Sequence, residues 1–257
     1  MPGLTSGTGS TPAVRWSGLI GRLLDLVFPP LCHHCRAFIP DAGQVHLCDR
    51  CLAELTPVGS PLCSSCGMPF ATIGGSDHRC GPCQIAPPPF QAARAALRFD
   101  GVARELIRRF KYQRRIQLRR PLALLTASQL APFVAEFQGD LLLPVPLHRR
   151  RLRQRGFNQA VLLGEVLASQ WRLPLDRTNL CRIRWTEPQV NLSAAERTRN
   201  VRGAFALAYP EEMHGKRIIL VDDVYTTGST VRECATVLTK EGKAAAVGVV
   251  TVARAIS

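Results

Sequence analysis

Four pairs of cysteines, each pair with two residues between its members, constrain the first third of this chain more than any other feature. The pairs are separated by 12, 11 and 13 residues and are formed by Cys32 and Cys35, Cys48 and Cys51, Cys63 and Cys66, and Cys80 and Cys83. A C-x-x-C turn presents two thiolates to one metal ion, and two such turns complete a tetrahedral zinc site. The eight cysteines therefore predict two structural zinc ions, in preference to redox dithiols or iron–sulfur clusters. Sequential pairing of the turns is favoured, and interleaved pairing stays open.

The charge of the chain suits a polyanionic ligand. Its 257 residues carry 33 basic and 19 acidic side chains, which gives a formal net charge of +14. The basic residues concentrate in 94–120 and in the run HRRRLRQR at 148–155. Nucleic acid and phosphorylated small molecules are the ligands that this pattern favours. Phe99, Phe110 and Tyr112 lie near the first segment, and each is expected in the core rather than on a base-stacking surface.

The N-terminal residues predict no stable insertion into a membrane. Residues 1–15 are expected to form a disordered leader, and residues 16–28 an amphipathic helix, because their apolar side chains follow helical spacing. Arg22 and Asp25 interrupt that helix, which is too short and too charged to span a bilayer. A helix lying on the membrane surface is the alternative. We expect a cytoplasmic protein, since the cysteine pairs suit metal rather than disulfides.

The composition changes sharply within the rest of the chain. Residues 29–89 are rich in Cys, Pro, Gly and His and predict a double zinc-ribbon-like module. In residues 90–257, apolar strands alternate with helices. Strands are expected at 94–99, 140–146, 201–207, 217–222 and 245–254, and helices at 102–112, 122–134, 157–171 and 229–242. Buried strands separated by helices predict a mostly parallel sheet covered on both faces.

One segment, RIILVDDVYTTGST at 217–230, combines an apolar strand, two carboxylates and a turn of small residues that opens a helix. The backbone N–H groups of such a turn, together with the helix N-terminus, form an anion site of the size of one phosphate. Asp222 and Asp223 suit such a place when the ligand also brings hydroxyls or Mg²⁺. A phosphorylated ribose offers both a phosphate and hydroxyls. The alternative is an ordinary strand end with capping residues.

Several segments taken together resemble one protein family. They are FPPLCHHC, CSSCGMPF, LIRRFKY, PVPLHRRRLRQRGFNQA, EPQVNLSAAERTRNVRGAF and IILVDDVYTTGST. The last is similar to the signature with which type I phosphoribosyltransferases bind phosphoribosyl pyrophosphate (PRPP), and residues 16–254 resemble the ComF family of competence-associated proteins. The resemblance implies an α/β fold of the type I phosphoribosyltransferase kind, with a parallel-rich sheet flanked by helices and a small N-terminal four-cysteine zinc-ribbon-like module.

Carried over to this chain, the resemblance implies site residues in three segments. The signature implies catalytic Asp222 and Asp223, which hold the ribose hydroxyls, within a PRPP-binding set of Val221, Asp222, Asp223, Thr226, Thr227, Gly228, Ser229 and Thr230. The pyrophosphate loop is expected to use Pro146, His148, Arg149 and Arg150. A flexible lid is expected to use Gln189, Arg197 and Asn200. Mg²⁺ would accompany PRPP, held mainly by phosphate oxygens.

The resemblance also implies a biological role. Members of the family act in DNA uptake, natural competence or the use of imported DNA, which implies single-stranded DNA and components of a DNA-uptake helicase or channel as partners. The zinc module and residues 94–120 would contact the strand. Two alternatives stay open: an active phosphoribosyltransferase with an unknown acceptor in nucleotide metabolism, and a non-catalytic PRPP sensor.

Overall fold

The computed structural model describes residues 29–40, 43–72, 74–186 and 194–256. The predicted leader at 1–15 and the predicted amphipathic helix at 16–28 lie outside these residues. Within the part of the chain that is described, no helix combines the length and the apolar character needed to cross a bilayer.

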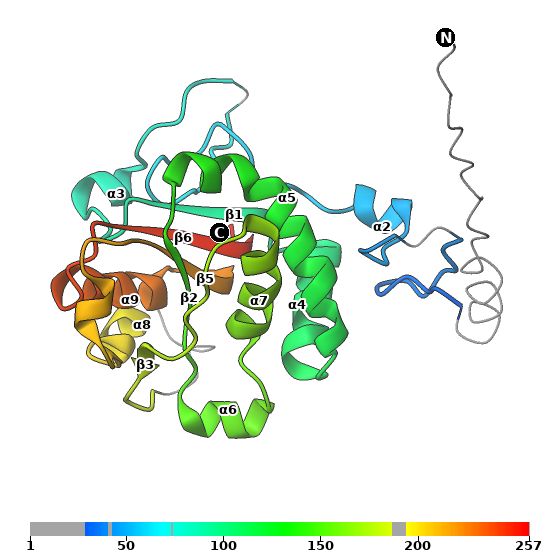
Figure 1. The fold of residues 1–257 in the computed structure, drawn as a ribbon. Helices are drawn as coiled ribbons and strands as arrows, with labels where there is room; N and C mark the ends of the chain where they lie inside the picture. Colours follow the sequence, from blue (N-terminus) through cyan, green and yellow to red (C-terminus); the bar gives the residue numbers. More distant parts are fainter. Residues whose placement is uncertain (1–28, 41–42, 73, 187–193, 257) are drawn as a thin grey trace, which may run out of the picture.

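A four-stranded parallel sheet forms the centre of the molecule (Figure 1). Its strands are β1 (Ala92–Arg98), β6 (Ala246–Arg254), β5 (Arg217–Tyr225) and β2 (Leu141–Pro144), in this spatial order. All three pairings between neighbouring strands are parallel, as the sequence predicts. The inner strands β5 and β6 are buried along almost their whole length because they are runs of apolar residues without polar alternation.

Helices cover both faces of this sheet, which confirms the predicted architecture (Figure 1). The helices on one face are α4 (Gly101–Tyr112), α5 (Arg119–Phe137) and α7 (Gln159–Trp171). Those on the other face are α8 (Ala194–Val201) and α9 (Ser229–Lys240). Ile219 and Val221 of β5 belong to the apolar core under the first group, whereas Ile218 and Leu220 belong to the core under the second. One strand supplies both cores because successive side chains point to opposite faces.

The prediction of a strand at 201–207 is wrong in its first half. Helix α8 ends at Val201, and Gly203, with a φ of 64°, turns the chain before β4 (Phe205–Leu207) begins. Strand β4 does not join the main sheet but pairs antiparallel with β3 (Leu180–Arg182), a strand that the periodicity did not indicate. Other short elements absent from the prediction are α2 (Asp49–Ala53), α3 (Gly81–Ile85), η1 (Ile116–Leu118), α6 (Arg149–Arg155) and η3 (Pro210–Met213).

The cysteine-rich segment covers the outer side of β1, the strand at one end of the sheet. Pro57 forms an isolated antiparallel bridge with Leu97 of β1. The N–H of Val58 donates to the carbonyl of Ala96 at 3.0 Å, and the N–H of Arg98 donates to the carbonyl of Thr56 at 2.8 Å. The backbone of β1 is therefore hydrogen-bonded on both sides, to β6 and to the cysteine-rich segment.

Candidate functional site

The eight paired cysteines form two separate four-sulfur clusters. In each cluster the sulfur atoms lie within 4.8 Å of one another; the first cysteine group is Cys32, Cys35, Cys48 and Cys51, and the second is Cys63, Cys66, Cys80 and Cys83. Sequential pairing is thus confirmed, and the interleaved alternative is wrong. The Cys35–Cys48 and Cys66–Cys80 sulfur distances are 3.6 Å and 3.8 Å. Tetrahedral thiolates about 2.3 Å from zinc lie about 3.8 Å apart, so each donor set fits one zinc ion.

Backbone N–H groups prepare one sulfur of each group to bind metal. The N–H of Cys48 lies 3.5 Å from Cys32 Sγ, and those of Cys66 and Cys80 lie 3.4 Å and 3.3 Å from Cys63 Sγ. Burial disfavours the thiolate, but donors of this kind together outweigh it and lower the pKa of the Cys32 and Cys63 thiols to about 6. The thiolate is the form that binds zinc.

A groove of about 440 Å³ opens at the carboxyl edge of the parallel sheet. This is the edge at which open α/β folds bind their ligands. Two carboxylates line the groove, those of Asp222 and Asp223 near the end of β5. They face four cations, contributed by Lys111, Arg151, Arg155 and Arg182. The balance of charge favours an anionic ligand.

The two acids are adjacent in β5 and therefore point to opposite faces of the sheet. Asp223 is 4% exposed, and its Oδ1 forms an ion pair of 2.8 Å with Lys111 Nζ, at the end of α4. The other carboxylate oxygen, Asp223 Oδ2, is buried and has no hydrogen-bond partner among the described residues. Asp222 Oδ1 accepts the N–H of Asp223 at 2.8 Å. A buried oxygen without a partner in a groove is a position at which a ligand can bind.

Burial and the neighbouring charge of Asp223 raise the pKa of Asp222 from 3.8 to about 7. A group whose pKa rises on folding stabilises the protein fully below its unfolded pKa, and this contribution is lost as the pH rises through the folded pKa. We therefore expect the free energy of unfolding of Asp222→Asn to rise relative to that of the parent by up to about 4 kcal/mol as the pH increases from about 4 to about 8. Urea unfolding at both pH values measures this difference. Asp100→Asn, at a half-exposed surface ion pair, is the matched control. Parallel pH profiles for Asp222→Asn and the parent would contradict the assignment.

The turn that follows β5 has the predicted form, with α9 beginning at Ser229. Gly228 caps this helix with a φ of 77°, and a Cβ atom there would collide with the side chain of Tyr225. Thr227 Oγ1 and Ser229 Oγ lie 2.8 Å apart. Residues 224–231 line a small hollow of about 30 Å³, which shares Asp222 and other residues with the larger groove. Backbone and hydroxyl groups thus surround one end of the groove.

The segment expected as the pyrophosphate loop follows β2, the strand that pairs with β5 in the sheet. Pro146 and His148 line the groove, whereas Arg149 and Arg150 are not among its lining residues. His148 Nδ1 accepts the N–H of Arg150 at 3.2 Å and so caps α6. The guanidinium of Arg150 lies 5.0 Å from the ring centre of Trp185. Of the four residues proposed for this loop, two therefore face the groove in this structure.

Of the three residues expected in the lid, only Asn200 has a described side chain. Gln189 lies outside the described residues, and only the backbone of Arg197 is placed, on α8. Asn200 is also on α8, where its carbonyl accepts a hydrogen bond of 3.0 Å from Arg184 Nη2. Asn200 is not among the described residues that line the groove.

Several groove residues were missed by the reasoning from sequence, among them Lys111, Arg155, Gln159 and Arg182. Arg155 is 9% exposed, and its guanidinium lies 5.5 Å from the ring centre of Tyr112. Gln159 Oε1 and Arg182 Nε are buried without a hydrogen-bond partner in the described part of the chain. Lys111, Arg155 and Gln159 could have been found, because they lie in LIRRFKY and RGFNQA, within the segments on which the family resemblance rests. We find no comparable signal for Arg182.

Comparisons with known proteins agree with this architecture. Residues 23–84 match the family model of the double zinc ribbon domain. The chain is 36% identical over 224 residues to "DNA utilization protein YhgH" of Escherichia coli, covering 86% of this chain and 95% of that protein. It is 32% identical over 220 residues to "Competence protein F" of Haemophilus influenzae, covering 82% of this chain and 91% of that protein. A purine phosphoribosyltransferase of Pyrococcus horikoshii aligns with a TM-score of 0.32 and 18% identity, over 52% of this chain and 83% of that one. Such a TM-score says nothing about activity.

The parallel sheet covered by helices on both faces, the groove at its carboxyl edge and the two cysteine groups define an α/β protein with an N-terminal double zinc-ribbon module. The sequence identity to its relatives, and the share of the chain that it covers, then show the family. The chain belongs to the ComF family.

Proposed function

We propose that the groove binds PRPP with Mg²⁺, and that the protein acts in the uptake or utilisation of DNA. One observation carries the first half of this proposal: two carboxylates and four cations line the groove, and the turn at 226–230 lines a hollow that shares Asp222, Thr226 and Thr230 with it. The turn at 226–230 suits a 5′-phosphate because its N–H groups and the α9 N-terminus favour an anion. Asp222 and Asp223 would accept hydrogen bonds from the ribose hydroxyls.

The basic residues of the groove suit the pyrophosphate of PRPP. Arg151 and Arg155 line it together with Pro146 and His148, and Lys111 forms an ion pair with Asp223. Mg²⁺ bound with PRPP would neutralise further charge, chiefly through phosphate oxygens. The oxygen atoms of the donor set fit this hard cation, and Asp223 Oδ2 has no protein partner among the described residues.

The biological half of the proposal rests on the relatives, which are named for DNA utilization and for competence. We propose that this chain, too, handles single-stranded DNA in the cytoplasm, together with helicase or channel components of the uptake machinery. The net charge of +14 supports such a partner. Contacts to phosphate would dominate, so the affinity for DNA should fall steeply with salt.

The groove also allows an active phosphoribosyltransferase, because its cations could hold pyrophosphate as it leaves. The assay that separates catalysis from sensing supplies PRPP, Mg²⁺ and candidate bases or DNA to the purified protein. Release of pyrophosphate would support a transferase. Binding of PRPP without release would support a sensor.

We expect Thr227→Val to weaken PRPP binding about tenfold or more, because it removes a hydroxyl from the turn that would hold the 5′-phosphate. Calorimetry with PRPP and Mg²⁺ measures the effect. Thr236→Val is the matched control, since Thr236 lies on α9, the helix after the turn, where its hydroxyl donates to the carbonyl of Arg232 at 2.9 Å. Equal affinities for the parent and Thr227→Val, or equal losses in both variants, would refute the placement of the phosphate.

A further inference from the structure

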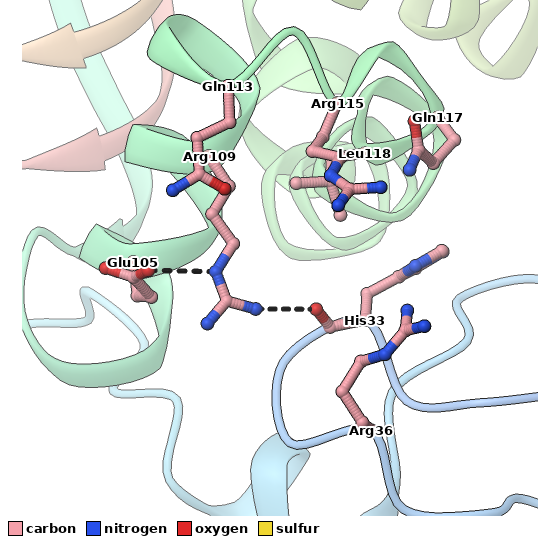
Figure 2. A pocket seen from close by; sticks show the side chains of 8 residues that line it. All are labelled: His33, Arg36, Glu105, Arg109, Gln113, Arg115, Gln117 and Leu118. Atoms are coloured by element: carbon pink, nitrogen blue, oxygen red, sulfur yellow. Dashed lines mark hydrogen bonds and ion pairs between the residues drawn. The ribbon is translucent and has the colours of Figure 1, made fainter.

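A second basic hollow lies away from the groove, between the first cysteine group and the end of α4. Figure 2 shows it from close by. We call it the knuckle cleft; its volume is about 310 Å³, and it is lined by His33, Arg36, Glu105, Arg109, Gln113, Arg115, Gln117 and Leu118. His33 and Arg36 come from the turn between Cys32 and the next metal-binding pair, and the other residues come from α4 and η1. Segments about seventy residues apart in the sequence thus form one recess.

Arg109 holds the two sides of the knuckle cleft together. Its Nε donates to Glu105 at 2.8 Å and its Nη1 to the carbonyl of His33 at 3.0 Å (Figure 2). Nη1 also donates to the carbonyl of His34 at 3.0 Å. Glu105, the one acid of the cleft, is therefore engaged by Arg109. Leu118, 2% exposed, supplies apolar surface beneath the polar groups. The charges of Arg109 and Glu105 therefore compensate each other inside the cleft.

Two further arginines leave the knuckle cleft with an excess of positive charge. Arg36 and Arg115 are exposed and have no acidic partner among the described residues. Figure 2 shows their guanidinium groups around the same opening as that of Arg109. Isolated surface arginines are ordinary, but a pair that faces one recess from two different segments forms a site for an anion.

The knuckle cleft and the groove share no lining residue, but consecutive residues at the end of α4 line the two of them. Gln113 and Arg115 line the cleft, whereas Tyr112 lines the groove. Arg114 Nη2 donates to the carbonyl of Gln154 at 3.3 Å and so joins this turn to α6, with its five arginines. Tyr112 is 63% exposed, so its predicted place in the core is wrong, and its ring lies 5.5 Å from the guanidinium of Arg155. Basic side chains therefore continue from one site to the other.

We infer that the knuckle cleft binds a backbone phosphate of a single nucleic-acid strand, with Arg36 and Arg115 as its cationic contacts. A recess of this size admits one strand, whereas a duplex presents its phosphates on a wide convex surface. The adjoining basic turn and α6 continue the path of the strand toward the groove. This inference rests on the proposed handling of single-stranded DNA and adds the place at which the strand is held.

The test measures the fluorescence anisotropy of a labelled single-stranded oligothymidylate bound by the zinc-loaded full chain, at several salt concentrations. Arg36→Ala/Arg115→Ala is expected to bind about tenfold more weakly at moderate salt. The slope of log affinity against log salt should also become shallower by about 1.4, which corresponds to two lost phosphate contacts. An equally strong competition by duplex DNA of the same length would overturn the preference for a single strand.

Arg79→Ala/Arg172→Ala is the matched control, because it removes the same charge from two exposed arginines outside the cleft. It should retain the affinity and the salt slope of the parent. An equal loss of oligonucleotide affinity in both double variants would show that the net charge, and not the knuckle cleft, determines binding. PRPP calorimetry on Arg36→Ala/Arg115→Ala separates the two proposals: oligonucleotide binding should fall while PRPP affinity stays at the parent value. A parent protein that binds PRPP but no oligonucleotide would refute this inference alone.

Discussion

Replacing Cys83 with serine is expected to remove one of two zinc ions and to destabilise the molecule far beyond the second cysteine group. Cys83 is 1% exposed and, with Cys63 and Cys66, belongs to the same apolar cluster as Leu143 of β2 and Leu220 of β5. Binding of a structural zinc ion contributes roughly 10 kcal/mol, which is comparable to the whole stability of a domain, roughly 5–15 kcal/mol. Loss of the zinc ion would therefore also lower the free energy of unfolding of the sheet that packs against this cysteine group.

Elemental analysis and thermal unfolding of the purified variant measure this result. We expect about two zinc ions per parent chain, about one per Cys83→Ser chain, and a melting temperature lowered by more than about 10 °C. Cys181→Ser is the matched control, because Cys181 lies outside both groups and its thiol donates to the carbonyl of Thr178 at 3.1 Å, as a hydroxyl can. Full zinc content in Cys83→Ser, or loss of zinc without loss of stability, would contradict the structural role.

Replacing Arg254 with methionine is expected to cost about 2–4 kcal/mol in the free energy of unfolding. Arg254 ends β6 and is 3% exposed. Its Nη1 donates to the carbonyl of Cys66 at 2.6 Å, its Nη2 lies 3.7 Å from Cys66 Sγ, and its guanidinium lies 4.3 Å from the ring centre of Tyr225. Methionine would leave the carbonyl buried without a partner and remove the positive charge beside the thiolates.

Urea unfolding at neutral pH measures this loss, with Arg98→Met as the matched control. Arg98 lies opposite Arg254 in the pairing of β1 with β6, but its side chain is 45% exposed and pairs with Asp100 at 3.5 Å. The control should change the free energy of unfolding by less than about 1 kcal/mol. Because Tyr225 packs against Gly228, Arg254→Met should also weaken PRPP binding. Similar losses of stability in both variants would show that Arg254 acts only as another surface charge.

The sequence predicted the parts of this protein that depend on local spacing. The distance between cysteines predicted both metal groups, and the order of apolar strands and helices predicted a parallel sheet covered on both faces. The turn at 226–230 was predicted because strand, acids, glycine and helix start are neighbours in the chain.

What the sequence could not predict depends on contacts between distant segments. Lys111 and Asp223 form an ion pair across 112 residues, and no local periodicity connects them. The pairing of β3 with β4 likewise joins two three-residue strands, each too short to show a pattern. Tyr112 was assigned to the core by its apolar ring, but it lies at the end of α4, where the chain turns away from the sheet.

The hydrogen bonds between the cysteine-rich segment and β1 have a consequence for solubility. A strand at the end of a sheet, with free N–H and C=O groups, is a template for addition of strands from other molecules. Here the residues around Pro57 occupy those groups, and the strand they protect is largely apolar. Loss of zinc would thus do more than loosen a small module, because it would uncover a surface prone to aggregation. Zinc binding by the two cysteine groups would therefore oppose self-association as well as stabilise the fold.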